Sequence, residues 1–158
     1  MTNQADVCLT FDAACDAALE MENRIYRNYL EALRTVKDQA ALAILRDAAL
    51  VKLEHKHKLE KAALRGGFDE VPVDGPVPTM NLKIRCCDLH RIGPEADNRK
   101  ALAYAVQMAE DALEFYRNMS EHCSGAPMAE LFKSLGDDQT KHLQQLEDDY
   151  EEHFLTEG

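Results

Sequence analysis

Proline and glycine are distributed very unevenly along this chain, and their distribution is the strongest constraint on its fold. Four of the five prolines and four of the seven glycines fall between Gly66 and Asn98. The segments on either side are rich in Ala, Leu, Glu, Lys and Gln, which favour helices. The sequence therefore predicts two long helical flanks joined by a segment that is not helical.

Each flank is too long for one helix of a globular domain, and each contains a signal for a break. In the first flank, Asp38 has the side chain of an N-cap. In the second, Gly125 can close one helix and Pro127 can occupy the first turn of the next. We therefore expect a single all-α domain over residues 1–158, with helices at about 7–37, 39–64, 97–123 and 127–155 and a crossover over 66–96.

The length of the central segment distinguishes between bundle topologies. Short loops give an up-down-up-down bundle, whereas one long connection between the second and third helices gives the ferritin-like arrangement. Such a connection must run back along helices that are roughly 35–45 Å long, and about 30 residues can do so. The sequence favours a ferritin-like four-helix bundle made of two helical hairpins joined by a long crossover.

The two flanks also resemble each other in sequence. Met21 is followed by Tyr29 eight residues later, and Met108 is followed by Tyr116 at the same distance. A histidine then follows each tyrosine, after 28 residues in the first flank and after 26 in the second. We interpret this pattern as an internal duplication of a helical hairpin.

Charge and hydropathy exclude several classes of function. The formal net charge is −11, which argues against nucleic-acid binding because that depends on clustered Lys and Arg. No apolar run approaches the roughly 18 residues of a membrane span, and the N-terminal "MTNQADVC" does not have the pattern of a signal peptide. We therefore expect a cytoplasmic protein without nucleic-acid or membrane partners.

The five cysteines include no CxxC pair, so a rubredoxin-type iron site is excluded. Their odd number favours reduced cytosolic thiols over a disulfide framework. Cys86, Cys87 and His90 could alternatively bind a metal or supply a redox thiol. Cys123, which follows His122, could be an activated thiol. Inert reduced thiols remain the simpler interpretation of all of them.

Helical periodicity selects one buried face on each predicted helix. On the first helix this face is apolar or aromatic except for one glutamate: Phe11, Cys15, Ala18, Glu22, Ile25, Tyr29, Leu33 and Val36. The corresponding residues of the second helix are Leu50, Glu54, His57 and Leu64. Those of the third and fourth are Leu102, Ala105, Ala109, Ala112, Tyr116, Leu131, Leu135, His142 and Leu146, with Asp138 and Gln139 at the centre of the fourth.

Two carboxylates are thus expected in one core, and a carboxylate buried without a partner costs several kcal/mol. Lys61, at the far end of the second helix, is the one cation that this reading places on the buried faces. A divalent metal held by Glu22, Glu54, His57 and His142 would offset the cost directly, because imidazole and carboxylate are suitable ligands.

With these residues the chain resembles the rubrerythrin-like branch of the ferritin-like superfamily. Bundles of that family hold two irons through one Glu on each of two helices and Glu-x-x-His on each of the other two. The resemblance covers the flanks, roughly residues 17–64 and 97–154. The first flank matches in full, with Glu22, Tyr29 and the Glu54-x-x-His57 motif.

The second flank departs from the family pattern at two positions. Ala109 stands where the family has its third Glu, and Gln139 replaces the Glu of the second Glu-x-x-His, which leaves only His142. Four carboxylates balance two divalent metals, whereas two balance one. We therefore expect a single-metal or partly occupied site, with three candidates for additional ligands besides Gln139: Asp138, Glu110 and Asp47.

The resemblance implies iron, as one or two ions, with manganese or zinc as substitutes. It also implies redox chemistry with O₂ or peroxide, for which an electron-donor protein would supply the electrons. Glu54 and His57 would hold one metal, Glu22 would complete or bridge the site, and His142 would bind from the opposite hairpin. Tyr29 and Tyr116 would lie beside the metal. The resemblance also implies a homodimer that lacks a rubredoxin domain.

A second interpretation stays open, and with it the question of whether the protein is an enzyme. The same groups could hydrogen-bond to one another and to water, with Glu54 protonated or paired with His57. The protein would then be a catalytically inactive dimeric scaffold or binding module, which Ala109 and Gln139 favour. In that case the two tyrosines are ordinary core residues. His55, His122 and His153 are expected at the surface in either case.

Overall fold

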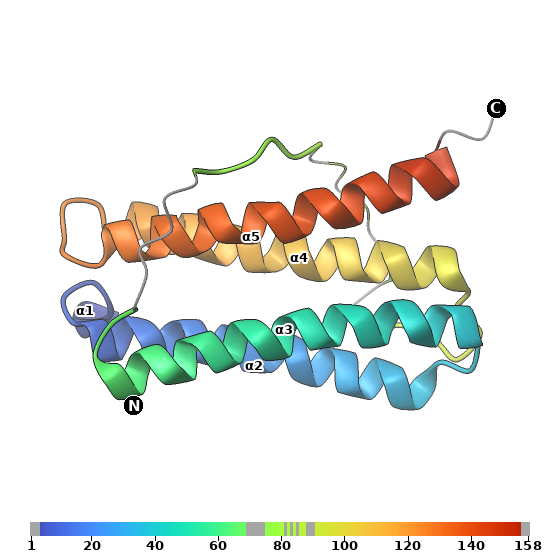
Figure 1. Cartoon of the computed structure of the whole chain (residues 1–158), viewed down its shortest axis with the longest axis horizontal. Helices are drawn as coiled ribbons and strands as arrows, with labels where there is room; N and C mark the ends of the chain where they lie inside the picture. Colours follow the sequence, from blue (N-terminus) through green and yellow to red (C-terminus); the bar gives the residue numbers. More distant parts are fainter. Residues whose placement is uncertain are drawn as a thin grey trace.

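The computed structural model describes residues 4–68, 75–80, 82, 84, 86–87 and 91–155 of the chain. These residues form no strand. Four long helices, α2 (Phe11–Thr35), α3 (Gln39–Arg65), α4 (Asn98–His122) and α5 (Ala129–Tyr150), form one bundle (Figure 1). A short α1 (Gln4–Val7) precedes them, and α5 continues into a π-helical turn, η2 (Glu151–Leu155). The predicted all-α four-helix architecture is confirmed, with helix ends that differ by a few residues.

Side chains and glycine define the helix ends. The carboxylate of Asp38 accepts a hydrogen bond from the Ala41 N–H at 2.9 Å, so the predicted N-cap of α3 is present. Asp97 caps α4 in the same way. At the end of α3, Gly66 has φ of 78°, a left-handed conformation that residues with a Cβ atom rarely adopt.

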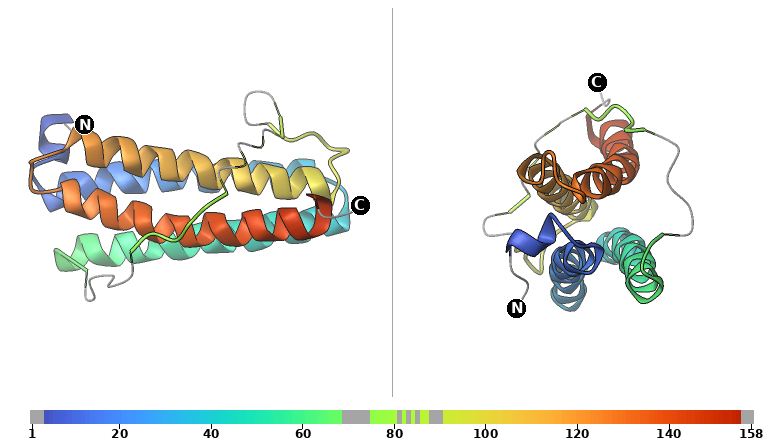
Figure 2. Two further views of the ribbon diagram at one scale, coloured as in Figure 1. Left: turned by 90° about the horizontal axis from the view of Figure 1, so that it is seen from above. Right: turned by 90° about the vertical axis from the view of Figure 1, so that its left-hand side faces the viewer.

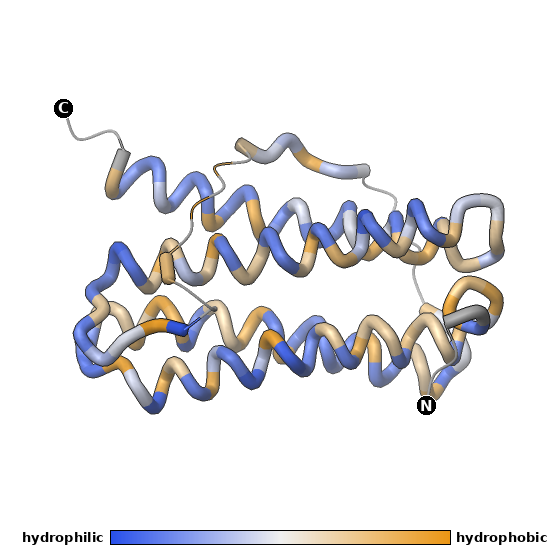
Figure 3. The backbone as a smooth tube through the Cα atoms, turned by 180° about the vertical axis from the view of Figure 1, so that it is seen from behind, coloured by the Kyte–Doolittle hydropathy of each residue, from blue (hydrophilic) through white to orange (hydrophobic). Residues whose placement is uncertain are grey.

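The helices associate as two antiparallel pairs. In the end-on view α2 lies beside α3 and α4 lies beside α5, with the two pairs stacked on each other (Figure 2). α3 packs closely against α4 and thereby joins the pairs. Apolar and polar positions recur within each turn or two of every long helix, as in amphipathic helices with one buried face (Figure 3).

The connection from α3 to α4 starts at one end of the bundle and finishes at the other (Figure 1). Its described residues are attached to the outside of the second pair by buried polar side chains. The Val77 N–H donates to Thr140 Oγ1 at 3.0 Å, and the Met80 and Leu82 N–H groups donate to the two carboxylate oxygens of Glu147 at 2.9 and 3.2 Å. Glu147 is fully buried, so these two hydrogen bonds replace water around its carboxylate.

The predicted buried faces are correct for α2 and α4 and wrong for α3. All five residues predicted for the buried face of the third helix are buried. Of the residues predicted for the first helix, all are buried except Phe11 and Leu33, which are half-buried. On α3, Leu50 and Leu64 are 52% and 90% exposed, and Glu54 and His57 are exposed as well. The face that α3 buries is instead formed by Leu45, Ala48, Ala49, Lys52, Leu59 and Ala62.

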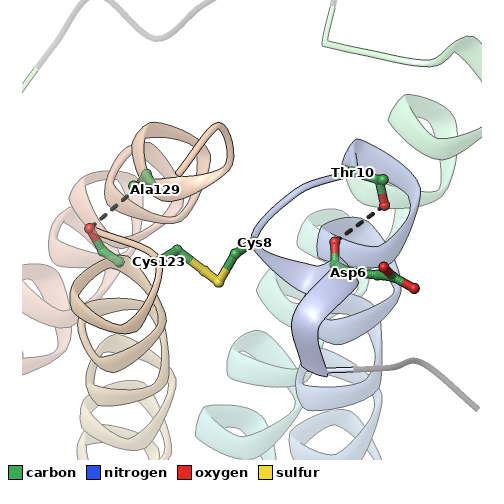
Figure 4. The surroundings of a disulfide bond; sticks show 6 residues. Asp6, Cys8, Thr10, Cys123 and Ala129 are labelled. Carbon is green, nitrogen blue, oxygen red and sulfur yellow. Dashed lines mark hydrogen bonds between the residues drawn. A yellow bond between two sulfur atoms is a disulfide. The ribbon is translucent and has the colours of Figure 1, made fainter. Parts of the chain in front are cut away.

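The expectation of reduced thiols is wrong for four cysteines. Cys8, just before α2, forms a disulfide with Cys123 at the end of α4, with a Cα–Cα distance of 5.0 Å (Figure 4). The adjacent Cys86 and Cys87 are also joined by a disulfide, while Cys15 is a free, buried thiol. His90, the third member of the predicted Cys–Cys–His group, lies outside the described residues. None of the described helices combines the length and apolar character needed to cross a membrane.

Candidate functional site: a polar centre within the bundle

Six polar side chains meet in the middle of the bundle, and every long helix contributes at least one. We call this cluster the polar centre; it consists of Glu22 from α2, Lys52 and His55 from α3, Tyr116 from α4, and Gln139 and His142 from α5. Apolar core residues surround it on all four helices. Polar groups that are buried from water need hydrogen-bond partners within the protein.

Glu22 and Lys52 form a buried ion pair at the heart of the polar centre. Lys52 Nζ lies 3.0 Å from Glu22 Oε2, and the two side chains are 0% and 1% exposed. Burial lowers the pKa of Lys52 because it disfavours the ammonium form, and the adjacent Glu22 carboxylate partly opposes that effect. Lys52 is a residue of the polar centre that the sequence analysis does not identify, since the predicted face of this helix placed only Lys61 on the buried side.

Tyr116 and Gln139 complete the hydrogen bonding of this ion pair. The Tyr116 hydroxyl donates to Glu22 Oε1 at 2.8 Å, and Gln139 Oε1 accepts from Lys52 Nζ at 3.4 Å. The amide nitrogen of Gln139 donates to the backbone oxygen of Ala109 at 3.3 Å. Gly136 permits this approach of α5 to α4, because a Cβ atom there would lie 3.3 Å from Tyr116 Cβ.

The two histidines of the polar centre are held in the neutral form. Desolvation, with the positive charge of Lys52 as the next cause, lowers the pKa of His55 to about 4 and that of His142 to about 3. His55 Nδ1 lies 3.9 Å from Glu22 Oε2, and its ring meets that of His142 edge-on at a centroid distance of 6.2 Å. The prediction that His55 lies at the surface is therefore wrong, since only 20% of its side chain is exposed.

The duplicated pattern fits the polar centre better than it fits the predicted site. His55 follows Tyr29 by 26 residues, the same spacing that separates His142 from Tyr116. Lys52 and Gln139 each follow their tyrosine by 23 residues. Helices α3 and α5 therefore carry Lys52-x-x-His55 and Gln139-x-x-His142 at matching positions. The family that the chain resembles has Glu-x-x-His at both positions.

The same correspondence accounts for an unusual feature of Tyr29. This tyrosine is fully buried, and its hydroxyl has no hydrogen-bond partner among the described residues. Its counterpart Tyr116 donates to Glu22, and the position that corresponds to Glu22 in the second hairpin is Ala109. The Tyr29 hydroxyl thus lacks the carboxylate that the repeat would have supplied. Its ring packs edge-on against Tyr104, with centroids 5.7 Å apart.

The remaining candidate ligands lie outside the polar centre as defined here. Glu54, His57 and Asp47 are exposed, and Glu110 is half-buried. Asp138 is 40% exposed and lies 3.7 Å from Lys141 Nζ in an ion pair. Within the part of the chain that the structure describes, no three or more His, Cys, Asp or Glu side chains are grouped so that they could hold a metal ion.

The side chains present do not fit the di-iron centre that the resemblance implies. The polar centre contains one carboxylate where four are required, and that carboxylate already accepts from an ammonium and a phenol. Comparisons with protein-family models, with curated proteins and with solved structures found no match to this chain.

Proposed function

We propose that the chain is a ferritin-like four-helix bundle in which the Lys52 ammonium occupies the place of a metal, and that it serves as a binding or scaffold module rather than as an iron enzyme. The single observation that carries this proposal is the 3.0 Å contact between Lys52 Nζ and Glu22 Oε2 in a core closed to solvent. The ferritin-like assignment is supported by α3 and α4, which run in the same direction on either side of a long connection (Figure 1).

The charges of the polar centre balance without a metal. Glu22 contributes one negative charge, Lys52 contributes one positive charge, and lowered pKa values keep His55 and His142 neutral at pH 7. A divalent ion about 4 Å from the ammonium would be repelled by on the order of 8 kcal/mol at an effective dielectric constant of about 20. Metal binding at this place would therefore require Lys52 to lose its proton or to leave.

One observation favours the alternative, a rubrerythrin-like iron protein that acts on O₂ or peroxide. His142 Nε2 is buried and has no hydrogen-bond partner among the described residues, and an imidazole nitrogen is a common metal ligand. The other side chains of the polar centre that are of metal-ligand type are Glu22 and His55. Iron binding, an electron donor and a homodimer therefore stay predictions of the resemblance.

Thermal unfolding separates the two candidates. We expect the same Tm in EDTA and in excess Fe(II), Mn(II) or Zn(II), because no metal forms part of the folded state. A metal-dependent rise in Tm that disappears in Glu22→Gln would contradict the proposal and favour the iron protein. Glu54→Gln is the matched control, because this exposed carboxylate belongs to the site predicted from sequence but not to the polar centre. A rise that disappears in Glu54→Gln instead would restore the original ligand set.

A further inference from the structure

A groove lies between the first half of α3 and the last turns of α5. It encloses a cavity of about 540 Å³, which is within the size range of small-molecule sites. Its apolar lining comes from four elements and includes Ala43, Ile44 and Ala48 on α3, Leu102 on α4, Leu146 on α5 and Phe154 on η2. A lining of this composition suits an apolar body a few carbon atoms wide.

The charged side chains of the groove are acidic and stand on opposite walls. Asp47 lines it from α3 and Asp149 lines it from α5, and the described lining includes no Lys or Arg. Arg99 lies toward the Phe154 end, where its Nε donates to the Tyr150 hydroxyl at 3.3 Å and its guanidinium is 5.7 Å from the centre of the Phe154 ring. A cation with an apolar body therefore complements the groove, whereas an anion is repelled.

His142 connects this groove to the polar centre. It lines the groove, and its Nε2 is buried without a hydrogen-bond partner in the described part of the chain. The depressed pKa of His142, about 3, leaves the imidazole neutral, so this residue adds no positive charge to the lining of the groove.

We propose that this groove binds a small organic amine, whose apolar body lies against Ile44, Leu102 and Leu146 and whose ammonium group lies between the Asp47 and Asp149 carboxylates. This inference deepens the proposed binding role by naming a ligand class, but it does not depend on Lys52 having replaced a metal. The net charge of −11 favours a cationic ligand over a second copy of the same acidic chain.

Three probes of similar shape test the proposal: octylammonium, octanol and octanoate, titrated at about pH 8, where His142 is neutral. We expect octylammonium to bind at one site, with NMR shifts confined to α3 and α5, and to bind at least about tenfold more tightly than octanol. Octanoate should not bind. Equal binding of octylammonium and octanol would overturn the amine assignment, and binding of none of the three would overturn the site.

Two variants locate the site. Asp47→Asn/Asp149→Asn should weaken octylammonium binding about tenfold or more, whereas Glu20→Gln/Glu60→Gln, which changes the net charge equally at exposed positions elsewhere, should not. Ala43→Trp fills the groove from an exposed position and should abolish binding without affecting the core. If Ala43→Trp instead disrupts a dimer of the wild-type chain, the groove is occupied by a second copy and the proposal is wrong. None of these results alters the metal test of the polar centre.

Discussion

Lys52 and Glu22 form an ion pair across α3 and α2, with 3.0 Å between Nζ and Oε2 and almost no exposure of either side chain. Tyr116 and Gln139 bond to the two partners from the other pair of helices. The pair therefore joins all four helices at one point. Removing one partner of a buried ion pair leaves the other charge without compensation, which costs more than removing both.

Single and double substitutions test this pair. We expect Lys52→Met and Glu22→Gln each to lower the free energy of unfolding by about 3–5 kcal/mol in urea denaturation. The double variant should lose much less free energy of unfolding than the two single variants together, because no charge is then buried without a partner. Lys61→Met, an exposed lysine on the same helix, should change stability by less than about 0.5 kcal/mol. Additive losses in the double variant would mean that the two groups do not compensate each other.

Acid should destabilise the fold through the two buried histidines. Their folded-state pKa values, about 4 for His55 and about 3 for His142, lie below the usual 6.5, so the unfolded chain binds protons first as the pH falls. Stability is therefore lost from about pH 6.5 down to about pH 3, with a slope of up to about 1.4 kcal/mol per pH unit for each group.

Substitution of one histidine checks the origin of this pH dependence. His55→Gln should give a flatter profile of unfolding free energy against pH between about 6.5 and 4. His57→Gln, at an exposed position two residues further on, should leave the slope unchanged. Equal slopes in both variants would assign the acid sensitivity to other groups.

The Cys8–Cys123 disulfide closes a loop between residues 115 positions apart, so it constrains the unfolded chain strongly. We expect Cys8→Ser/Cys123→Ser to lower the free energy of unfolding by about 2–5 kcal/mol. Cys86→Ser/Cys87→Ser, which removes a bond between adjacent residues, is the control and should cost far less. Cys15, whose pKa burial raises to about 11, should stay unreactive toward thiol reagents in the folded protein. An unchanged free energy of unfolding in Cys8→Ser/Cys123→Ser would contradict this account of the disulfide.

Glu147 fixes the central connection to α5 through the N–H groups of Met80 and Leu82. Glu147→Ala removes both acceptors, and we expect a loss of about 1–3 kcal/mol together with faster hydrogen exchange of these two amides. Asp148→Asn, at the exposed neighbouring position, should affect neither quantity. Unchanged exchange in Glu147→Ala would show that other contacts hold the connection.

The sequence predicts the architecture well because helix boundaries depend on local signals. The cap at Asp38 and the clustering of proline and glycine in one segment are visible without any tertiary information. The buried faces of α2 and α4 are also predictable, since apolar residues recur along them at regular helical spacing.

The predicted face of α3 is wrong because several of its leucines lie outside the buried face. Leu50, Leu53 and Leu64 are exposed, whereas the buried face combines Leu45 and Leu59 with alanines and a lysine. The spacing of Leu45, Ala48, Ala49, Lys52 and Leu59 contains the correct signal, and the repeated 26-residue interval from tyrosine to histidine contains it too. The pairing of Cys8 with Cys123 leaves no such signal, because it depends on the ends of two helices meeting in space.

Metal content is the most direct test of whether Lys52 stands in for a metal. The chain, produced with iron supplied, is compared by elemental analysis with Lys52→Glu/Ala109→Glu/Gln139→Glu, which restores the carboxylates of the family pattern. We predict no stoichiometric metal in the wild-type chain and bound divalent metal in the variant, because four carboxylates and two imidazoles then face one another without an ammonium. One or more metal ions per wild-type chain, lost in Glu22→Gln, would contradict the account.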